Sequence, residues 1–181
     1  QLQGGGNYNQ RMNFTPISAL SPLDGRYASK LNALRPLMSE QGYMHRRVQV
    51  EMAWFIALSD AGFAEFKPLS TKSRDYLISL VTNFNTEDAL AIKDEEKVTN
   101  HDVKAVEYWI KKKFKGHSEL EAAAEFVHFA CTSEDINNTG HALQLKGARA
   151  QVILPGLDGL IAKLREMAHT FADVPMLSRT H

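Results

Sequence analysis

The sequence lacks the features that mark several common classes of protein. It holds a single cysteine, Cys131, which excludes an internal disulfide and is typical of a reducing compartment such as the cytoplasm. No apolar run approaches the roughly 20 residues of a membrane-spanning helix. Lysine plus arginine and aspartate plus glutamate number 21 each, so no net charge attracts nucleic acid or an anionic membrane. We therefore expect neither as a partner.

Motifs that hold metals and cofactors are missing as well. The 7 histidines include no His-x-x-x-His pair, and one cysteine cannot form a zinc knuckle. The glycines form neither a dinucleotide-binding loop nor a Walker loop. The sequence therefore predicts no metal site and no bound cofactor.

Helical periodicity is the main signal that is present, and it predicts an all-α protein. Apolar residues recur at spacings of three and four in residues 36–62, 70–84 and 85–97 and again from Asn100 to Gly116. A further helix is expected from Ser118. The predicted buried stripes are Met44, Val48, Met52 and Phe55 in the first helix and Val103, Val106, Ile110 and Phe114 in the fourth. Asn85 and Asp88 form a predicted capping pair, and His128 is interpreted as a packed, hydrogen-bonded core histidine.

The stretch Ala130-Cys131-Thr132-Ser133-Glu134-Asp135-Ile136-Asn137-Asn138 carries the strongest hint of chemistry. Thr132 is a plausible N-cap with Asp135 as the acidic partner of a capping box. The unpaired N–H groups of a helix start, joined by the hydroxyls of Thr132 and Ser133, would make an anion site. The charges of Glu134 and Asp135 oppose that interpretation unless both side chains point away. A cap with no further role is the alternative.

Two other segments carry candidate site residues. In Thr99-Asn100-His101-Asp102, Asn100 can cap a helix and His101 would sit in its first turn, where the helix dipole disfavours the imidazolium. Asp102 could instead hold the ring or raise its pKa, and a surface or capping histidine is the alternative. In the turn Ser21-Pro22-Leu23-Asp24-Gly25-Arg26-Tyr27, Arg26 could grip a phosphate with a bidentate fork and Tyr27 could stack or donate. Taken alone, that turn is an ordinary loop.

The helical pattern after Thr132 continues for about forty residues, with Pro155 expected to kink it and not to end it. Such a helix approaches roughly 60 Å at 1.5 Å per residue. A domain of this size cannot cover it, so it needs partners from elsewhere in the chain or from other copies.

The wording Thr-Ser-Glu-Asp-Ile-Asn-Asn resembles a signature of the fumarase/aspartase superfamily, and the resemblance runs from about Ile17 to His181. Within the superfamily it is closest to the adenylosuccinate lyase family of the longer bacterial type. Residues 1–14 are polar and glycine-rich and lack the charged start and apolar core of a signal peptide, so we expect a flexible leader there. The resemblance implies an N-terminal helical domain at 15–130 and the first long helix of the superfamily's helical bundle at 131–181. It also implies a cytoplasmic homotetramer with active sites assembled from several subunits.

The same resemblance implies roles for individual residues. Arg26 and Tyr27 match the segment that binds the nucleotide phosphate, and Asn100, His101 and Asp102 match a segment that contacts substrate. Thr132 and Ser133 belong to the signature above, while Lys104 is a weaker candidate without a role. The closing Ser178-Arg179-Thr180-His181 matches the start of a second signature, which makes His181 the expected general acid, supported by His101, and Thr180 a substrate contact.

The family's chemistry is β-elimination of fumarate from adenylosuccinate to give AMP, and from a succinylated carboxamide ribotide (SAICAR) to give AICAR. Preorganised donors must hold the dianion that forms when the carbon-bound proton leaves, and a group titrating near neutrality must protonate the departing nitrogen. The serine-rich loop with Met-Pro-x-Lys-x-Asn that supplies the base in the family is absent here. We therefore expect an incomplete, inactive portion of the enzyme. The alternatives are another fumarate-releasing lyase, such as an argininosuccinate lyase, and a non-catalytic helical assembly module.

Overall fold

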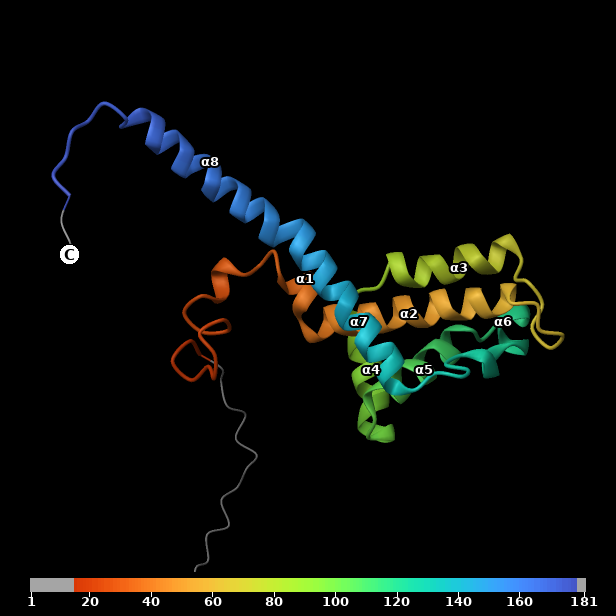
Figure 1. The fold of residues 1–181 in the computed structure, drawn as a ribbon. Helices are drawn as coiled ribbons and strands as arrows, with labels where there is room; N and C mark the ends of the chain where they lie inside the picture. The colour runs from red at the N-terminus through yellow and green to blue at the C-terminus, as the bar shows by residue number, and fades with distance from the viewer. Residues whose placement is uncertain (1–14, 179–181) are drawn as a thin grey trace, which may run out of the picture.

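The computed structural model describes residues 15–178. Within that range the chain forms helices and no strands, which confirms the predicted all-α class (Figure 1). The leader at 1–14 lies outside the described residues. The elements in chain order are η1 (Ala28–Lys30), α1 (Arg35–Met38), α2 (Glu40–Asp60), α3 (Thr71–Thr82), α4 (Thr86–Thr99), α5 (Asp102–Lys113), α6 (Ser118–Ala122), η2 (Ala124–Phe126), α7 (Ser133–Ala148), the π-helical turn η3 (Arg149–Ile153) and α8 (Leu154–Thr170).

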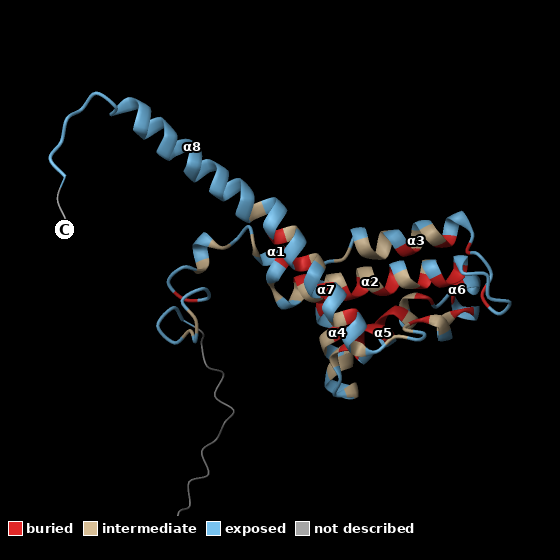
Figure 2. Ribbon diagram, in the orientation of Figure 1, coloured by how far each residue is buried: buried red, intermediate tan, exposed pale blue. Residues whose placement is uncertain are grey.

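Helix α2 is the centre of the packed body, with α3, α4, α5 and the start of α7 around it. All eight residues of the two predicted stripes on α2 and α5 are at most 2% exposed, so both stripes are confirmed. They meet the buried side chains Leu77, Ile92 and Leu120 from α3, α4 and α6. Each fully buried side chain of this kind stabilises the fold by roughly 1.5–3 kcal/mol, and the red band of Figure 2 follows these helices.

Local capping explains where most of the helices begin. Asn85 and Asp88 form the predicted capping box at the start of α4, and the Ser70 hydroxyl accepts from Ser73 N–H at the start of α3. The predicted 36–62 helix is instead divided at Ser39, whose extended backbone and hydroxyl cap α2. At Gly42 a Cβ would lie 2.7 Å from the Leu37 backbone, so only glycine allows α1 and α2 to approach this closely.

The long helix predicted after Thr132 is present as α7, η3 and α8, continuous over residues 133–170. Pro155 lies at the start of α8, directly after the π-helical turn η3. Because proline has no N–H, a widened turn at this point lets the helix continue past the lost hydrogen bond. The prediction that Pro155 does not end the helix is confirmed, and a bend at this point stays a prediction.

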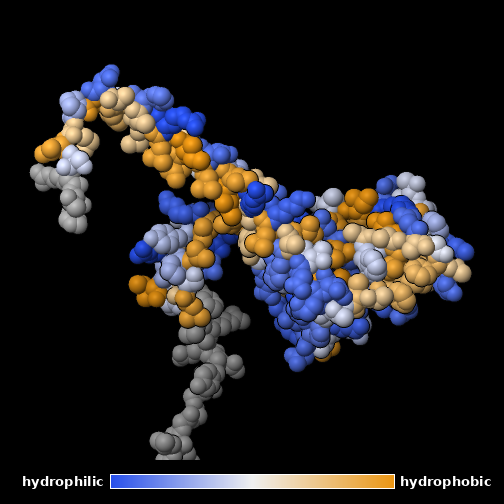
Figure 3. Space-filling view, in the orientation of Figure 1, coloured by the Kyte–Doolittle hydropathy of each residue, from blue (hydrophilic) through white to orange (hydrophobic). Residues whose placement is uncertain are grey.

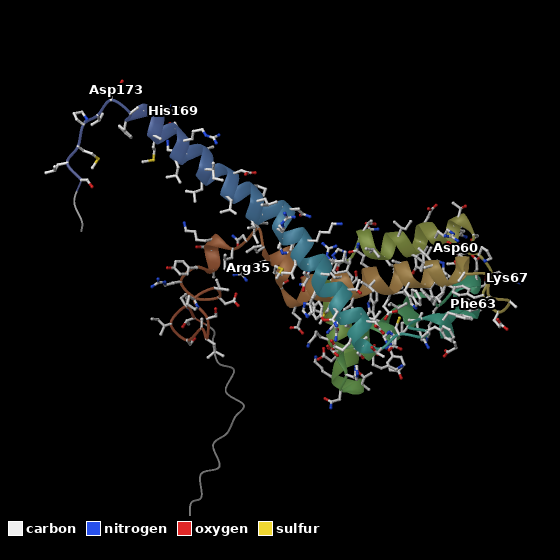
Figure 4. All side chains as sticks on the ribbon, in the orientation of Figure 1. Arg35, Asp60, Phe63, Lys67, His169 and Asp173 are labelled. Atoms are coloured by element: carbon white, nitrogen blue, oxygen red, sulfur yellow. The ribbon has the colours of Figure 1, made fainter. Side chains whose placement is uncertain are left out.

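The α8 rod leaves the body of the molecule, and all of its residues are exposed (Figure 2). Figure 4 places His169 and Asp173 at its far end, opposite to Asp60 and Lys67 at the other end of the molecule. Helix α7 follows the predicted domain boundary at residue 131 and packs against α2, which precedes that boundary. The boundary therefore stays a prediction. In residues 15–178 no helix has both the length and the apolar run needed to cross a bilayer.

Candidate functional site

The turn between α4 and α5 carries the first set of predicted site residues. Asn100 ends α4 in the left-handed conformation, with φ +51°. His101 is the N-cap of α5, because its Nδ1 accepts from the Lys104 N–H at 3.2 Å. This differs from the expectation that Asn100 would be the cap and His101 a first-turn residue. Asparagine adopts the left-handed region more readily than most residues other than glycine, which leaves the cap position to histidine.

The start of α7 carries the second set. Thr132 is the N-cap, as predicted, and the Asp135 carboxylate accepts from its N–H at 2.7 Å and from its hydroxyl at 3.1 Å. These two bonds hold the pKa of Asp135 below its usual range, the backbone bond contributing most. The Glu134 carboxylate accepts from the side-chain amides of Asn137 and Asn138 at 3.1 and 3.3 Å. Both acidic side chains are therefore engaged within the first turns of α7.

Arg47 of α2 brings the two segments together. Its Nη2 pairs with Asp102 Oδ2, and its Nε donates to Asn137 Oδ1 at 3.0 Å. The Arg47 side chain is only 6% exposed, so the pair is shielded from competing water on one side. Ser133 lies four residues before Asn137 and therefore on the same face of α7. The structure thus joins Asp102 of α5 and Asn137 of α7 through one buried guanidinium.

Aromatic stacking orients the Arg47 guanidinium. The central carbon of the guanidinium lies 4.0 Å from the Tyr43 ring centroid, and the Tyr43 ring also stacks on His141, with 4.1 Å between ring centroids. A planar guanidinium fits such a stack, whereas a lysine ammonium cannot reproduce both the stack and the forked hydrogen bonds. The stack therefore fixes the direction in which Arg47 presents its donors.

Charge around Asp102 favours its ionised form. Partial burial alone would raise the pKa of this carboxyl, but the Val103 N–H bond at 2.8 Å and the Arg47 guanidinium outweigh burial and hold the pKa below its usual range. Asp102 Oδ1 lies 3.6 Å from His101 Nδ1. A hollow of about 520 Å³ opens beside this turn, lined by Lys93, Glu96, Lys97, Asn100, His101 and Asp102. Such a volume can hold a small anionic ligand next to these groups.

Arg26 and Tyr27 lie on the exposed segment before α1, which Figure 1 draws apart from the body of helices. The predicted turn is confirmed, since Asp24 and Gly25 both donate from the backbone to Ser21 O. Arg26 stacks on the Tyr27 ring at 4.6 Å and donates to its hydroxyl. Within this chain, the structure therefore does not bring the pair to the Arg47 cluster.

Two predicted residues, Thr180 and His181, lie outside the described residues. The last predicted candidate, Lys104, forms an ion pair with Glu107, with 2.8 Å between Lys104 Nζ and Glu107 Oε2. Within residues 15–178 no group of three or more histidine, cysteine, aspartate or glutamate side chains is arranged to hold a metal ion.

Sequence reasoning treated α2 as scaffold and missed Arg47. Arg47 is far from its partners along the chain, since Asp102 and Asn137 follow it by 55 and 90 residues. One signal was available. Arg47 stands between the apolar positions Met44 and Val48, and an arginine next to a buried stripe needs a partner.

Comparison with known families identifies the class of protein to which this helical chain belongs. A family model described as lyase matches residues 25–181, and the chain therefore belongs to the lyase family. Over 171 residues it is 50% identical to an adenylosuccinate lyase of Vibrio cholerae serotype O1, and 50% and 48% identical to those of Haemophilus influenzae and Escherichia coli strain K12. Each alignment covers 94% of this chain but 38% of the relative. The predicted resemblance to adenylosuccinate lyases is confirmed, and the chain spans well under half the length of the curated relatives it matches.

Proposed function

We propose that the full-length protein is an adenylosuccinate lyase, which eliminates fumarate from adenylosuccinate to give AMP and from SAICAR to give AICAR. The 50% identity to an enzyme of that name over 94% of this chain carries the proposal. The convergence of Asp102 and Asn137 on Arg47 supports it, because it joins the two segments that the resemblance assigns to the substrate site.

In this proposal the α4–α5 turn and the start of α7 bind the succinyl part of the substrate. Asn100, His101 and Asp102 line the hollow beside the turn, and the Ser133 hydroxyl with the first N–H groups of α7 offers donors to a carboxylate. Thr132 joins them only when its hydroxyl is released from Asp135. These donors stabilise the dianion that forms when the carbon-bound proton is removed.

The departing nitrogen needs a proton, and His181 is proposed to deliver it, with His101 in support and Thr180 as a substrate contact. Imidazole suits this step because its ordinary pKa lies near neutrality. The base that removes the carbon-bound proton is assigned to a part of the full-length protein that this chain does not include. The step needs no metal and no cofactor.

We further propose that the enzyme is a cytoplasmic homotetramer with composite active sites. An apolar stripe runs along one side of α8 (Figure 3), formed by Leu154, Leu157, Leu160, Ile161, Leu164, Met167 and Phe171, each at least 38% exposed. Helices from other copies would cover this stripe. Arg26 and Tyr27, which lie away from Arg47 in one chain, would then bind the substrate's phosphate in a site completed by another copy.

Fumarate release tests the proposal and separates it from its alternatives. The full-length protein should release fumarate from adenylosuccinate and not from argininosuccinate. Changing Arg26 to Gln should raise KM for adenylosuccinate by about tenfold or more, because a bidentate phosphate contact is lost. Release from argininosuccinate alone would favour the other lyase, and no release from either substrate would leave a helical assembly module.

A further inference from the structure

The loop that leads into α7 has an unusual backbone. His128 and Ala130 both adopt the left-handed conformation, with φ +62° and +59°, and neither is glycine. L-residues avoid this region because Cβ crowds the following carbonyl oxygen. Two such residues within three positions need external contacts to hold them. Thr132, the N-cap of α7, follows Ala130 by two positions.

Glu51 of α2 supplies the first of these contacts. Its Oε1 accepts from the His128 ring at 2.7 Å, and its Oε2 accepts from the His128 backbone N–H at 3.2 Å. The Glu51 side chain is fully buried. Burial raises the pKa of Glu51, and the neighbouring Glu107 carboxylate adds to this, although the His128 contacts oppose it. One carboxylate thus fixes both the ring and the backbone of a left-handed residue.

Trp54 supplies the second contact, one turn further along α2. Its ring N–H donates to the Phe129 carbonyl at 2.8 Å. Glu51 and Trp54 are three residues apart and therefore share a face of the helix. Arg47, which holds Asn137, precedes Glu51 by four residues on that same face. A single face of α2 therefore presents polar groups to the loop and to the first turns of α7.

Packing alone does not hold the loop. Phe129 contacts the rings of Phe63 and Phe126 but is 46% exposed, and Ala130 is exposed, so apolar packing covers only part of the loop. A further chain of polar contacts lies behind His128, whose Nε2 is 3.9 Å from Glu107 Oε1. Glu107 in turn pairs with the Lys104 side chain. The backbone N–H of Lys104 donates to His101 Nδ1. The loop and the α4–α5 turn are thereby tied to the same framework.

We propose that Glu51 and Trp54 are positioning residues, which hold the His128–Ala130 loop so that Ser133 and the first N–H groups of α7 present their donors to substrate. The functional part of this inference rests on the proposed lyase activity. Donors that act on developing charge must be placed before the charge forms, and a shift of about 1 Å costs up to 100-fold in rate. The contacts at Glu51 and Trp54 provide that placement from a buried helix.

The test uses the full-length protein and compares two tryptophans. Trp54→Phe keeps most of the ring packing and removes the N–H donor. Trp109→Phe is the matched control, because Trp109 is 4% exposed in the core and takes no part in the loop. Fumarate release from adenylosuccinate, thermal unfolding, and hydrogen–deuterium exchange of the peptide covering residues 128–135 are measured for both variants.

Trp54→Phe should raise exchange in that peptide and lower kcat, each by about tenfold, with KM within about twofold, because the donors act mainly in the transition state. Glu51→Gln should do the same, since an amide cannot accept from both His128 groups. Trp109→Phe should lower the melting temperature and leave kcat and loop exchange unchanged. His128→Asn, which tolerates the left-handed region and keeps an N–H donor, should retain loop protection that His128→Ala loses.

The proposal would be overturned if both Trp54→Phe and Glu51→Gln kept the loop exchange and kcat of the wild-type protein. It would also be overturned if these variants lowered only the melting temperature. If the wild-type protein releases no fumarate, the proposed activity fails separately. The exchange data then decide the clamp: faster exchange in Trp54→Phe but not in Trp109→Phe supports it, and equal exchange overturns it.

Discussion

The Arg47 guanidinium of α2 pairs with the Asp102 carboxylate of α5 while its Nε donates to Asn137 of α7. The arginine is buried and the aspartate is partly exposed, so the pair has one side in the core and the other at the hollow beside His101. Its geometry makes the position of the α4–α5 turn depend on the position of α7. This coupling joins the two segments that we propose as one site.

Replacing Arg47 by Met should therefore reduce fumarate release by the full-length protein by about tenfold or more and destabilise it by ~1–3 kcal/mol, since Asp102 and Asn137 lose their partner. Arg47→Lys should recover little, because lysine lacks the fork and the stack on Tyr43. The measurements are kcat/KM and denaturant unfolding.

Arg74→Met is the matched control for that prediction. Arg74 also pairs with a partly exposed carboxylate, Asp60, which Figure 4 shows at the end of α2 away from the α8 rod. The Arg74→Met variant should lose some stability and keep the kcat/KM of the wild-type protein. Equal losses of activity in the Arg47 and Arg74 variants would show that Arg47 acts only through stability.

The pH dependence of stability should carry a signature of Asp102. Because its pKa in the folded protein lies below the ordinary value of 3.8, its contribution is fully present above about pH 4 and is lost as pH falls through the folded pKa. Asp102→Asn should cost about 1 kcal/mol of unfolding free energy at pH 7, a figure reduced by the exposure of the carboxylate. Chemical denaturation of both proteins between pH 2 and pH 7 checks this, and two curves that stay parallel to pH 2 would contradict it.

Local signals were readable from the sequence, and contacts between distant segments were not. The Asn85–Asp88 capping box, the Thr132 cap and the stripes on α2 and α5 depend on residues within one or two turns of each other. His128 was correctly interpreted as a packed, hydrogen-bonded histidine, but its partner Glu51 lies 77 residues away. Nothing in local periodicity could name that partner.

Two local predictions were wrong, and each has a physical reason. Apolar residues continue at helical spacing across Ser39, so the sequence pattern does not show the division into α1 and α2. A capping serine at 39 and a glycine at 42 that permits close approach are compatible with that division. At Asn100 and His101 both residues can cap a helix, and the left-handed preference of asparagine decided between them.

Gly42 gives a direct test of the α1–α2 approach. Gly42→Ala should destabilise the 181-residue chain by ~1–3 kcal/mol, because the added Cβ overlaps the Leu37 backbone. Gly159→Ala on α8 is the matched control: nothing lies within 4 Å of its added Cβ, so helix propensity should stabilise it by up to ~1 kcal/mol. Thermal unfolding distinguishes the two, and equal melting temperatures would contradict the close approach.

The apolar stripe of α8 should control assembly. Changing Leu160 and Leu164 together to Glu should shift the full-length protein from a tetramer to smaller species in analytical ultracentrifugation, because charge would replace apolar area in the proposed interface. Glu166→Gln serves as control, since Glu166 lies on the other side of the helix in an exposed pair with Lys163. A tetramer that survives the double substitution would exclude α8 from the interface.

The most direct measurement is fumarate release from adenylosuccinate, followed by absorbance, with the full-length protein and with the 181-residue chain side by side. We predict release by the full-length protein and none by the 181-residue chain, because the proposed base lies outside it. Release by both would show that the base is within these residues. No release by either would contradict the proposed activity.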